Sequence, residues 1–305
     1  MVQSAIVVLG LILFEVISSI DNAIVNAHVL KTMPVRYRRF FLVWGLLLAV
    51  FVMRGVLPFL IVWMANAHLG IVETFRLAMS DPVKMEESLH HSKPLLLMGG
   101  GVYLVFVFLA WLFVEEKKYA FFVERLMHRQ SVWFYAVASI FITGVIWASM
   151  DVHEHMALAA SIGSTVFFLG DGFRRNAEDA EARLQGPNMS AWSKIVYLEV
   201  LDASFSIDGV IGAFAFTMSV PLILIGNGIG AFVVREFTVR GLDVVSRFAY
   251  LKNGAMYSIG VLGVIMVAES FGSEPPFWVA PLTTFVLLIV FLGMSIRELW
   301  VQKVL

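Results

Sequence analysis

The sequence contains no cysteine and has few charged residues for its length. The absence of cysteine excludes disulfide bonds, thiolate metal sites and a cysteine nucleophile. Charged residues occupy 15% of the 305 positions, whereas soluble proteins carry about 25%. The formal net charge of −1 gives no support for nucleic-acid binding. The remainder is mainly apolar, at 59% hydrophobic residues with a mean hydropathy of +0.84, which is typical of a polytopic membrane protein.

Long apolar segments predict an all-α fold with about nine transmembrane helices. A span needs about 20 mainly apolar residues. The segments that approach this length are roughly 4–29, 40–64, 94–114, 131–150, 156–171, 195–219, 221–240, 254–271 and 276–296. The fifth is short, so a re-entrant or broken helix is an alternative there. The polar segment 172–194 is predicted to be a cytoplasmic linker between two membrane halves, 1–171 and 195–305.

The distribution of lysine and arginine among the loops predicts the orientation in the membrane. One alternating set, which comprises 30–39, 115–130, 172–194, 241–253 and the C-terminus, is rich in these residues. The opposite set holds only Arg76, Lys84 and Lys93. Because basic loops stay on the cytoplasmic side, we expect an external N-terminus and a cytoplasmic C-terminus.

Two similar motifs place carboxylates inside predicted spans. FEVISSIDNAIVNA holds Glu15 and Asp21, LDASFSIDGVIGAFA holds Asp202 and Asp208 at the same spacing, and Glu199 precedes the second motif. Both motifs contain Ser-Ile-Asp, and in both a proline follows thirteen residues after the second acid. A charge at the bilayer centre costs about 2.5–3.5 kcal/mol on insertion scales and usually faces a bundle interior or a polar cavity. Five acids in a repeated motif therefore indicate a functional site.

The predicted topology makes the two copies run in opposite directions across the membrane. Inverted repeats around a midplane site are a common architecture of secondary transporters. In a straight helix the two acids of one motif differ by about 600° and face different sides. Either each helix lies between polar neighbours, or it is broken near Ser-Ile-Asp and frees carbonyl groups to coordinate an ion.

The candidate site is built from oxygen donors. The predicted metal ligands are Glu15, Asp21, Asn22, Glu199, Asp202 and Asp208, with Ser19, Asn26, Ser206, Asn227, Arg54 and Arg235 as supporting residues. Hard oxygen donors favour Mn²⁺, Ca²⁺ or Mg²⁺ over Zn²⁺ or Cu⁺. The alternative is that these groups only join helices through hydrogen bonds and ion pairs. The two arginines either pair with the acids or extend toward the cytoplasmic headgroups.

A second group of possible ligands is the sequence DVHEH, from Asp151 to His155. It lacks the HExxH pattern of helical zinc sites, and its two histidines do not share a helix face. We therefore expect a solvated turn, and we expect no enzymatic activity.

The two motifs, together with GNGIGAFVVRE and YLKNGAMYSIGV, resemble the TerC-type integral membrane proteins, in particular a bacterial branch with the sequence LDASFSxDGVIGAFA. The first family motif matches Glu15, Asp21 and Asn22, and the second matches Glu199, Asp202 and Asp208. Many members have Asp-Ser where this chain has Asp208-Gly209, which removes one possible hydroxyl ligand. The resemblance implies a TerC/LysE-like fold of inverted repeats in the bacterial inner membrane.

These features predict a divalent-cation transporter, an exporter of Mn²⁺ or Ca²⁺, with the bound cation as its substrate. The resemblance also implies a link to tellurite resistance and favours Mn²⁺. The alternative is a membrane scaffold that docks cytosolic stress-response proteins through 172–194.

Overall fold

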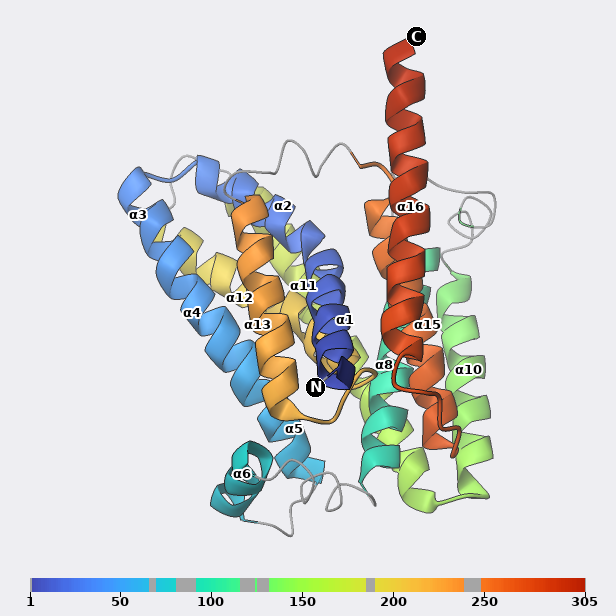
Figure 1. The fold of residues 1–305 in the computed structure, drawn as a ribbon. Helices are drawn as coiled ribbons and strands as arrows, with labels where there is room; N and C mark the ends of the chain where they lie inside the picture. The colour runs from blue at the N-terminus through green and yellow to red at the C-terminus, as the bar shows by residue number, and fades with distance from the viewer. Residues whose placement is uncertain are drawn as a thin grey trace.

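The structure is a computed structural model, and all regular structure in its described part is helical (Figure 1). The described residues are 2–65, 70–80, 92–115, 124, 132–184, 190–238 and 248–304. The helices are α1 (Val2–Ser18), α2 (Ile20–Lys31), α3 (Val35–Phe40), η1 (Phe41–Gly45), α4 (Leu46–Leu48), η2 (Ala49–Val56), α5 (Leu57–Ala65), α6 (Ile71–Ser80), α8 (Lys93–Phe113), α10 (Trp133–Met150), α11 (Glu154–Leu184), α12 (Ala191–Ala213), α13 (Val220–Glu236), α15 (Leu251–Ser270) and α16 (Val279–Val304). The elements η1 and η2 are π-helical turns within one long helix from Val35 to Ala65.

Six helical segments are long and apolar enough to cross a bilayer: Val35–Ala65, Lys93–Phe113, Trp133–Met150, His155–Asn176, Leu251–Ser270 and Val279–Trp300. The bent pair of α1 and α2 forms a possible seventh span. The helices α12 and α13 lie where spans were predicted, but α12 carries several charged residues and α13 has 17 residues. The all-α polytopic membrane fold is thus confirmed, with six or seven apolar spans among the described residues rather than about nine.

The fifth predicted span is not a short or broken helix. Instead α11 runs without interruption from Glu154 to Leu184, so that it also covers the first part of the predicted linker. Alanine, glutamate and arginine dominate the sequence NAEDAEARL at its end, and these residues have high helix propensity. Polarity alone therefore did not mark the end of the helix.

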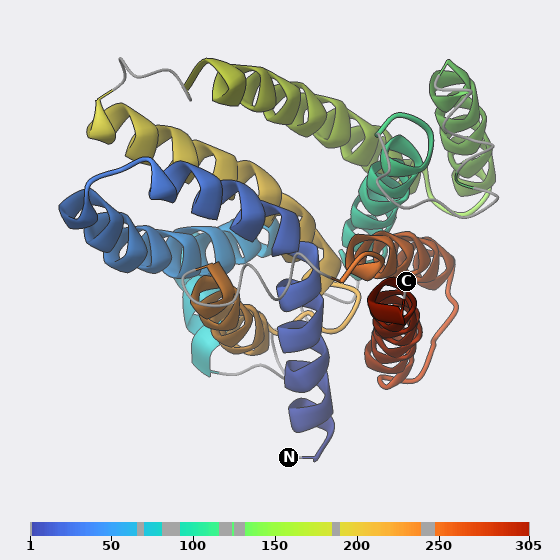
Figure 2. The ribbon, with the colours of Figure 1, turned by 90° about the horizontal axis from the view of Figure 1, so that it is seen from above.

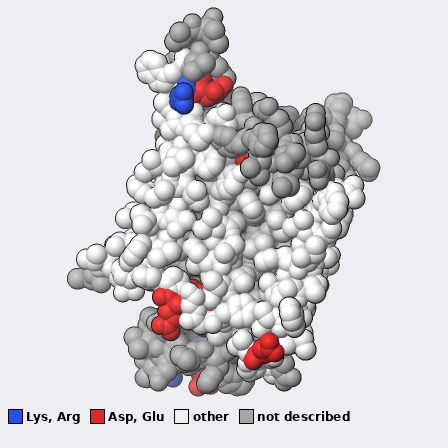
Figure 3. Space-filling model, turned by 90° about the vertical axis from the view of Figure 1, so that its right-hand side faces the viewer, with Lys and Arg blue, Asp and Glu red and all other residues white. Residues whose placement is uncertain are grey.

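The outer surface has the character of a lipid-facing belt. The face in Figure 3 is free of charged side chains across its middle and carries them at both ends. Exposed tryptophans lie near both ends of two peripheral helices, at Trp133 and Trp147 on α10 and at Trp278 and Trp300 around α16. Tryptophan is enriched at the two membrane–water interfaces, so these positions fit helices that span the bilayer.

The helices form two neighbouring groups (Figures 1 and 2). One group contains α1 to α5, α12 and α13, and the other contains α8, α10, α11, α15 and α16. Close helix contacts depend on small residues, as is common in membranes. A Cβ atom at Gly101 of α8 would lie 2.9 Å from the carbonyl oxygen of Gly263 on α15. Since α8 belongs to the first predicted half and α15 to the second, the two halves pack against one another.

Contacts along α12 define its direction relative to the first motif. The Lys194 ammonium donates to the Thr32 hydroxyl at 2.9 Å, and further along α12 Gly212 abuts the ring of Phe14. Later residues of α12 therefore contact earlier residues of the α1–α2 segment. The two motif helices are antiparallel, and these are the directions that an inverted repeat requires.

Candidate functional site

The first motif lies at a bend between two helices. The axes of Val2–Ser18 and Asn22–Lys31 differ by 54°, with Ser19 at the junction. The Ser18 hydroxyl donates to the backbone carbonyl of Glu15 at 3.3 Å, a type of side-chain bond that bends helices. Of the two alternatives for the motifs, a break near Ser-Ile-Asp is therefore present in the first motif, as a bend. The second motif differs, because α12 continues through Gly209 to Ala213.

Glu15 is held by a buried ion pair. Its Oε1 accepts hydrogen bonds from Arg54 Nη2 at 2.5 Å, from Arg54 Nε at 3.1 Å and from the Ser19 hydroxyl at 2.7 Å. Arg54 also donates from Nη1 to the Ala49 carbonyl at 3.0 Å. Glu15 and Arg54 are only 1% and 3% exposed. Of the two interpretations of Arg54, the structure supports pairing with an acid rather than extension to the headgroups.

Two glycines make the space that Glu15 occupies. A Cβ atom at Gly209 of α12 would lie 2.9 Å from Glu15 Oε2, and one at Gly230 of α13 would lie 2.6 Å from Glu15 Cβ. Real Cβ atoms essentially never approach so closely, so a larger residue at either position would displace the carboxylate. The Asp-Gly sequence of the second motif therefore has a structural reason.

Asp202 is partly buried and lies near this ion pair. Its carboxylate accepts a hydrogen bond from the Asn22 amide of α2, and it interacts electrostatically with Arg54, Arg235 and Glu15. The first acids of the two motifs, Glu15 and Asp202, therefore share Arg54 as a charged neighbour although they are far apart in sequence. This is the central pair of the candidate site.

The contacts between the motifs are reciprocal. Asn22 follows the second acid of the first motif and contacts Asp202, the first acid of the second motif. Gly209 follows the second acid of the second motif and abuts Glu15, the first acid of the first motif. Such an exchange of equivalent contacts is expected when two antiparallel copies cross near a twofold axis.

Several buried oxygen atoms in these helices make no hydrogen bond within the described part of the chain. They are Asn22 Oδ1, Asn26 Oδ1, Ser206 Oγ and Asn227 Oδ1. A buried polar atom without a partner costs about 1–3 kcal/mol, so such atoms need an explanation. Ser206 is one turn from Asp202 on α12, and the Asn227 amide donates to the Gly209 carbonyl at 3.4 Å. These oxygens therefore lie on the helices that carry Glu15 and Asp202, or pack against them.

Asp208 faces a different neighbour. Its Oδ1 accepts a hydrogen bond from the Tyr103 hydroxyl of α8 at 2.5 Å. Both residues line a small cavity of about 40 Å³ together with Asp171 and Arg174 of α11. Positions six apart in a helix point in different directions, so Asp208 turns away from the side of α12 that bears Asp202. No motif in the sequence pointed to Tyr103 as the partner of Asp208.

The other predicted residues surround the central pair. The carboxylate of Glu199 lies against Gly45 of η1, where a Cβ atom would overlap it. Arg235 donates to the Phe41 carbonyl, and its guanidinium lies 4.7 Å from the centre of the Phe41 ring. Its hydrogen bond therefore goes to the backbone rather than to an acid. The side chain of Asp21 lies outside the described part of the structure.

No group of three or more histidine, aspartate and glutamate side chains suited to a metal ion occurs among the described residues. Any cation at the central pair would therefore need amide and hydroxyl ligands as well. In DVHEH, Asp151, His153 and His155 are exposed, and the two imidazole rings lie 4.8 Å apart at the turn before α11. This agrees with the expected solvated turn.

Comparison with known proteins gives the family but not an activity. The family described as "Protein of unknown function (DUF475)" matches residues 20–301, and the chain therefore belongs to it. The chain is 29% identical over 85 residues to a protein of Bacillus subtilis (strain 168) called "Uncharacterized membrane protein YceF". That match covers 28% of this chain and 33% of the Bacillus protein. No solved structure matches. Family, relative and fold together define a polytopic membrane protein.

Proposed function

We propose that this protein carries a divalent cation, Mn²⁺ or Ca²⁺, across the membrane through a site centred on Glu15 and Asp202. The ligands would be these two carboxylates with the buried oxygens of Asn22, Ser206 and Asn227. Carboxylate, amide and hydroxyl oxygens are the donors that hard divalent cations prefer. The resemblance of both motifs to TerC-type proteins supports the same proposal and favours Mn²⁺.

The observation that carries the proposal is the combination of charge and unsatisfied oxygen. Two carboxylates from antiparallel motifs share Arg54 as a charged neighbour, and the same group of helices holds buried amide and hydroxyl oxygens that accept no hydrogen bond from any described residue. Helix association alone needs neither charge nor unsatisfied acceptors. A bound cation would satisfy both.

Arg54 would be the resident counter-charge of the site. In the described conformation it neutralises Glu15, and η2, which carries it, is a π-helical segment. Short π-helical segments are frequent at functional sites. An arriving cation would compete with the guanidinium for Glu15, and the displaced Arg54 would link cation binding to movement of the Val35–Ala65 helix. Opposed movement of two inverted repeats would then open the site alternately to each side.

The test is calorimetric titration of purified protein with Mn²⁺, Ca²⁺, Mg²⁺ and Zn²⁺. We expect saturable binding of Mn²⁺ or Ca²⁺, lost in Asp202→Asn. Asp208→Asn is the matched control, because it removes a carboxylate from the same helix on a side that faces Tyr103. We expect it to keep the binding. Absence of binding to folded wild-type protein, or equal loss in both variants, would contradict the proposal. The scaffold alternative predicts no saturable binding at all.

A further inference from the structure

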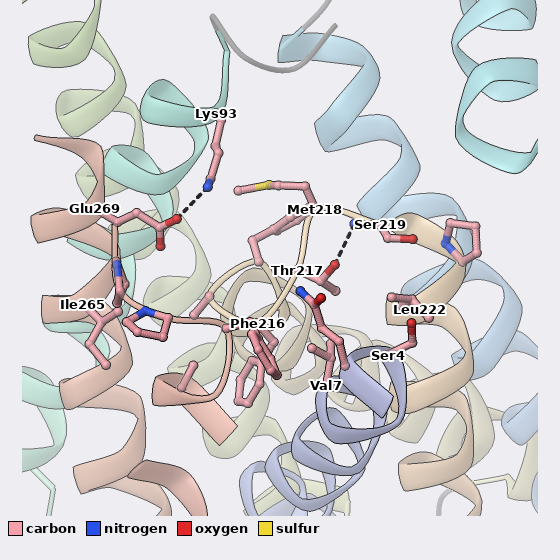
Figure 4. A pocket seen from close by; sticks show the side chains of 18 residues that line it. Ser4, Val7, Lys93, Phe216, Thr217, Met218, Ser219, Leu222, Ile265 and Glu269 are labelled. Carbon is pink, nitrogen blue, oxygen red and sulfur yellow. Dashed lines mark hydrogen bonds and ion pairs between the residues drawn. The ribbon is translucent and has the colours of Figure 1, made fainter. Parts of the chain in front are cut away.

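A large cleft opens at the end of the molecule where α1 begins (Figure 4). Its volume is about 500 Å³. The start of α1, the turn after α12, the start of α13, the end of α15 and the segment before α16 line it. The cleft therefore lies between the two groups of helices, on the helices that also carry the central acids.

The cleft has polar walls and enough room for a hydrated ion. Lys93 and Glu269 form an ion pair of 2.7 Å on one wall, and the hydroxyl groups of Ser4, Thr217 and Ser219 line another (Figure 4). At about 30 Å³ for each water of the liquid, a space of this size holds about 17 water molecules. An octahedral divalent cation with six waters fits within it. The cavity beside Asp208, at about 40 Å³, is too small for such an ion.

A compact aromatic layer separates the cleft from the central acids. Phe216 lines the cleft, and its ring lies 5.5 Å from that of Phe14 at an angle of 42°. Phe14 is 1% exposed and packs on Gly212 of α12. Gly212 is three residues beyond Gly209, the neighbour of Glu15, a separation of about 4.5 Å along the helix. About one helical turn of packed side chains therefore lies between the cleft and the central site.

The two aromatic residues are held differently. Phe14 belongs to α1, directly before Glu15. Phe216 lies after the end of α12 at Ala213, in the turn that precedes α13. The backbone amides of Phe216 and Thr217 donate to the Ala213 carbonyl at 3.0 and 3.2 Å, so a change in that turn would alter these bonds at the end of α12 and not the bonds within it. Phe216 is therefore the member of the layer that lies outside the regular helices.

We propose that this cleft is a vestibule that takes a hydrated divalent cation, and that the Phe14–Phe216 pair is the gate between it and the Glu15–Asp202 site. The inference rests on the proposed function for the identity of the ion. The existence of the gate is independent of it, because access to the buried site is measurable without any transport.

Because the chain has no cysteine, a thiol reagent labels only cysteines that are introduced by mutation, and its rate measures access to each position. Single cysteines are introduced at Ser4→Cys and Thr217→Cys in the cleft and at Ser206→Cys beyond the layer. Each variant is treated with a membrane-impermeant methanethiosulfonate reagent in sealed membranes of both orientations. We expect both cleft cysteines to react from the same side, whereas the cysteine at position 206 stays unreactive from that side.

Removing the Phe216 ring from the aromatic layer should expose position 206 to the reagent. Adding Phe216→Ala to the Ser206→Cys protein should raise its labelling rate from the cleft side at least about tenfold, because the rate follows the populated fraction of the open state. The matched control is Phe285→Ala, which shortens a half-exposed phenylalanine on the outside of α16 and should leave the rate unchanged. If Phe216→Ala does not give folded protein, Phe216→Leu tests the same step with less loss of volume.

Two results would overturn the gate. One is rapid labelling of Ser206→Cys from the cleft side with both phenylalanines present. The other is an unchanged labelling rate of Ser206→Cys when Phe216→Ala or Phe216→Leu is added and the protein is folded. If the labelling follows the expectation while metal binding is absent, the vestibule stands and the proposed ion is wrong. If metal binds while the labelling fails, the cation site stands and its route lies elsewhere.

Discussion

The substitution Arg54→Met tests the buried ion pair most sharply. It removes two of the three hydrogen bonds to Glu15 Oε1 and leaves a carboxylate that is 1% exposed without its counter-ion. Loss of one partner from a buried pair costs about 3–5 kcal/mol. At about 2–4 °C per kcal/mol, the melting temperature should fall by roughly 10 °C. The double variant Glu15→Gln/Arg54→Met, which has neither charge, should recover most of this loss.

Tryptophan fluorescence during thermal unfolding in detergent measures the effect, since the chain has 8 tryptophans. The control is Arg175→Met, which breaks an exposed pair with Asp171 of 2.7 Å and should cost no more than about 1 kcal/mol. Mn²⁺ should raise the melting temperature of Arg54→Met more than that of wild type, because the cation no longer competes with the guanidinium. The rise should be smaller for the double variant. An Arg54→Met protein as stable as Arg175→Met would mean that the ion pair with Glu15 does not stabilise the fold.

Two further variants test the packing around the acids. Gly209→Ala should destabilise the protein by about 1–3 kcal/mol, because the new Cβ atom would meet Glu15. The control is Gly144→Ala, where no described atom lies near the Cβ position. This control should be neutral or slightly stabilising in the same melting assay. Tyr103→Phe removes the hydrogen bond to Asp208 and should lower stability by about 1–3 kcal/mol. Titration with Mn²⁺ should give the same affinity as wild type. A loss of Mn²⁺ binding in this variant would contradict the separation of Asp208 from the cation site.

Local patterns in the sequence were sufficient to find the helices and the charged motifs. Apolar segments of membrane length and a repeated spacing of acids are properties of short stretches, and both are visible without a structure. A break near Ser-Ile-Asp was one of two alternatives for both motifs, and the sequence did not indicate that only the first motif would bend. The end of α11 was not foreseen, because helix propensity continued past the last apolar residue.

The choice of partners within the site could not be predicted from the sequence. Arg54 and Arg235 both lie in apolar runs, yet one binds Glu15 and the other binds a backbone carbonyl. That difference depends on which helix packs against which, and it has no local signal. The same holds for Asp208, whose partner Tyr103 comes from a helix more than a hundred residues earlier. The glycine after Asp208 was interpreted as a missing ligand, whereas the structure explains it as the space for Glu15.

Cation transport that depends on Asp202 is measured directly as Mn²⁺ flux into proteoliposomes that contain the purified protein and a metal-sensitive dye. We expect saturable flux with wild type and with Arg175→Met, and no flux above that of empty liposomes with Asp202→Asn, as the proposed transport requires. Equal flux with wild type and Asp202→Asn, or none with folded wild-type protein for either Mn²⁺ or Ca²⁺, would contradict it.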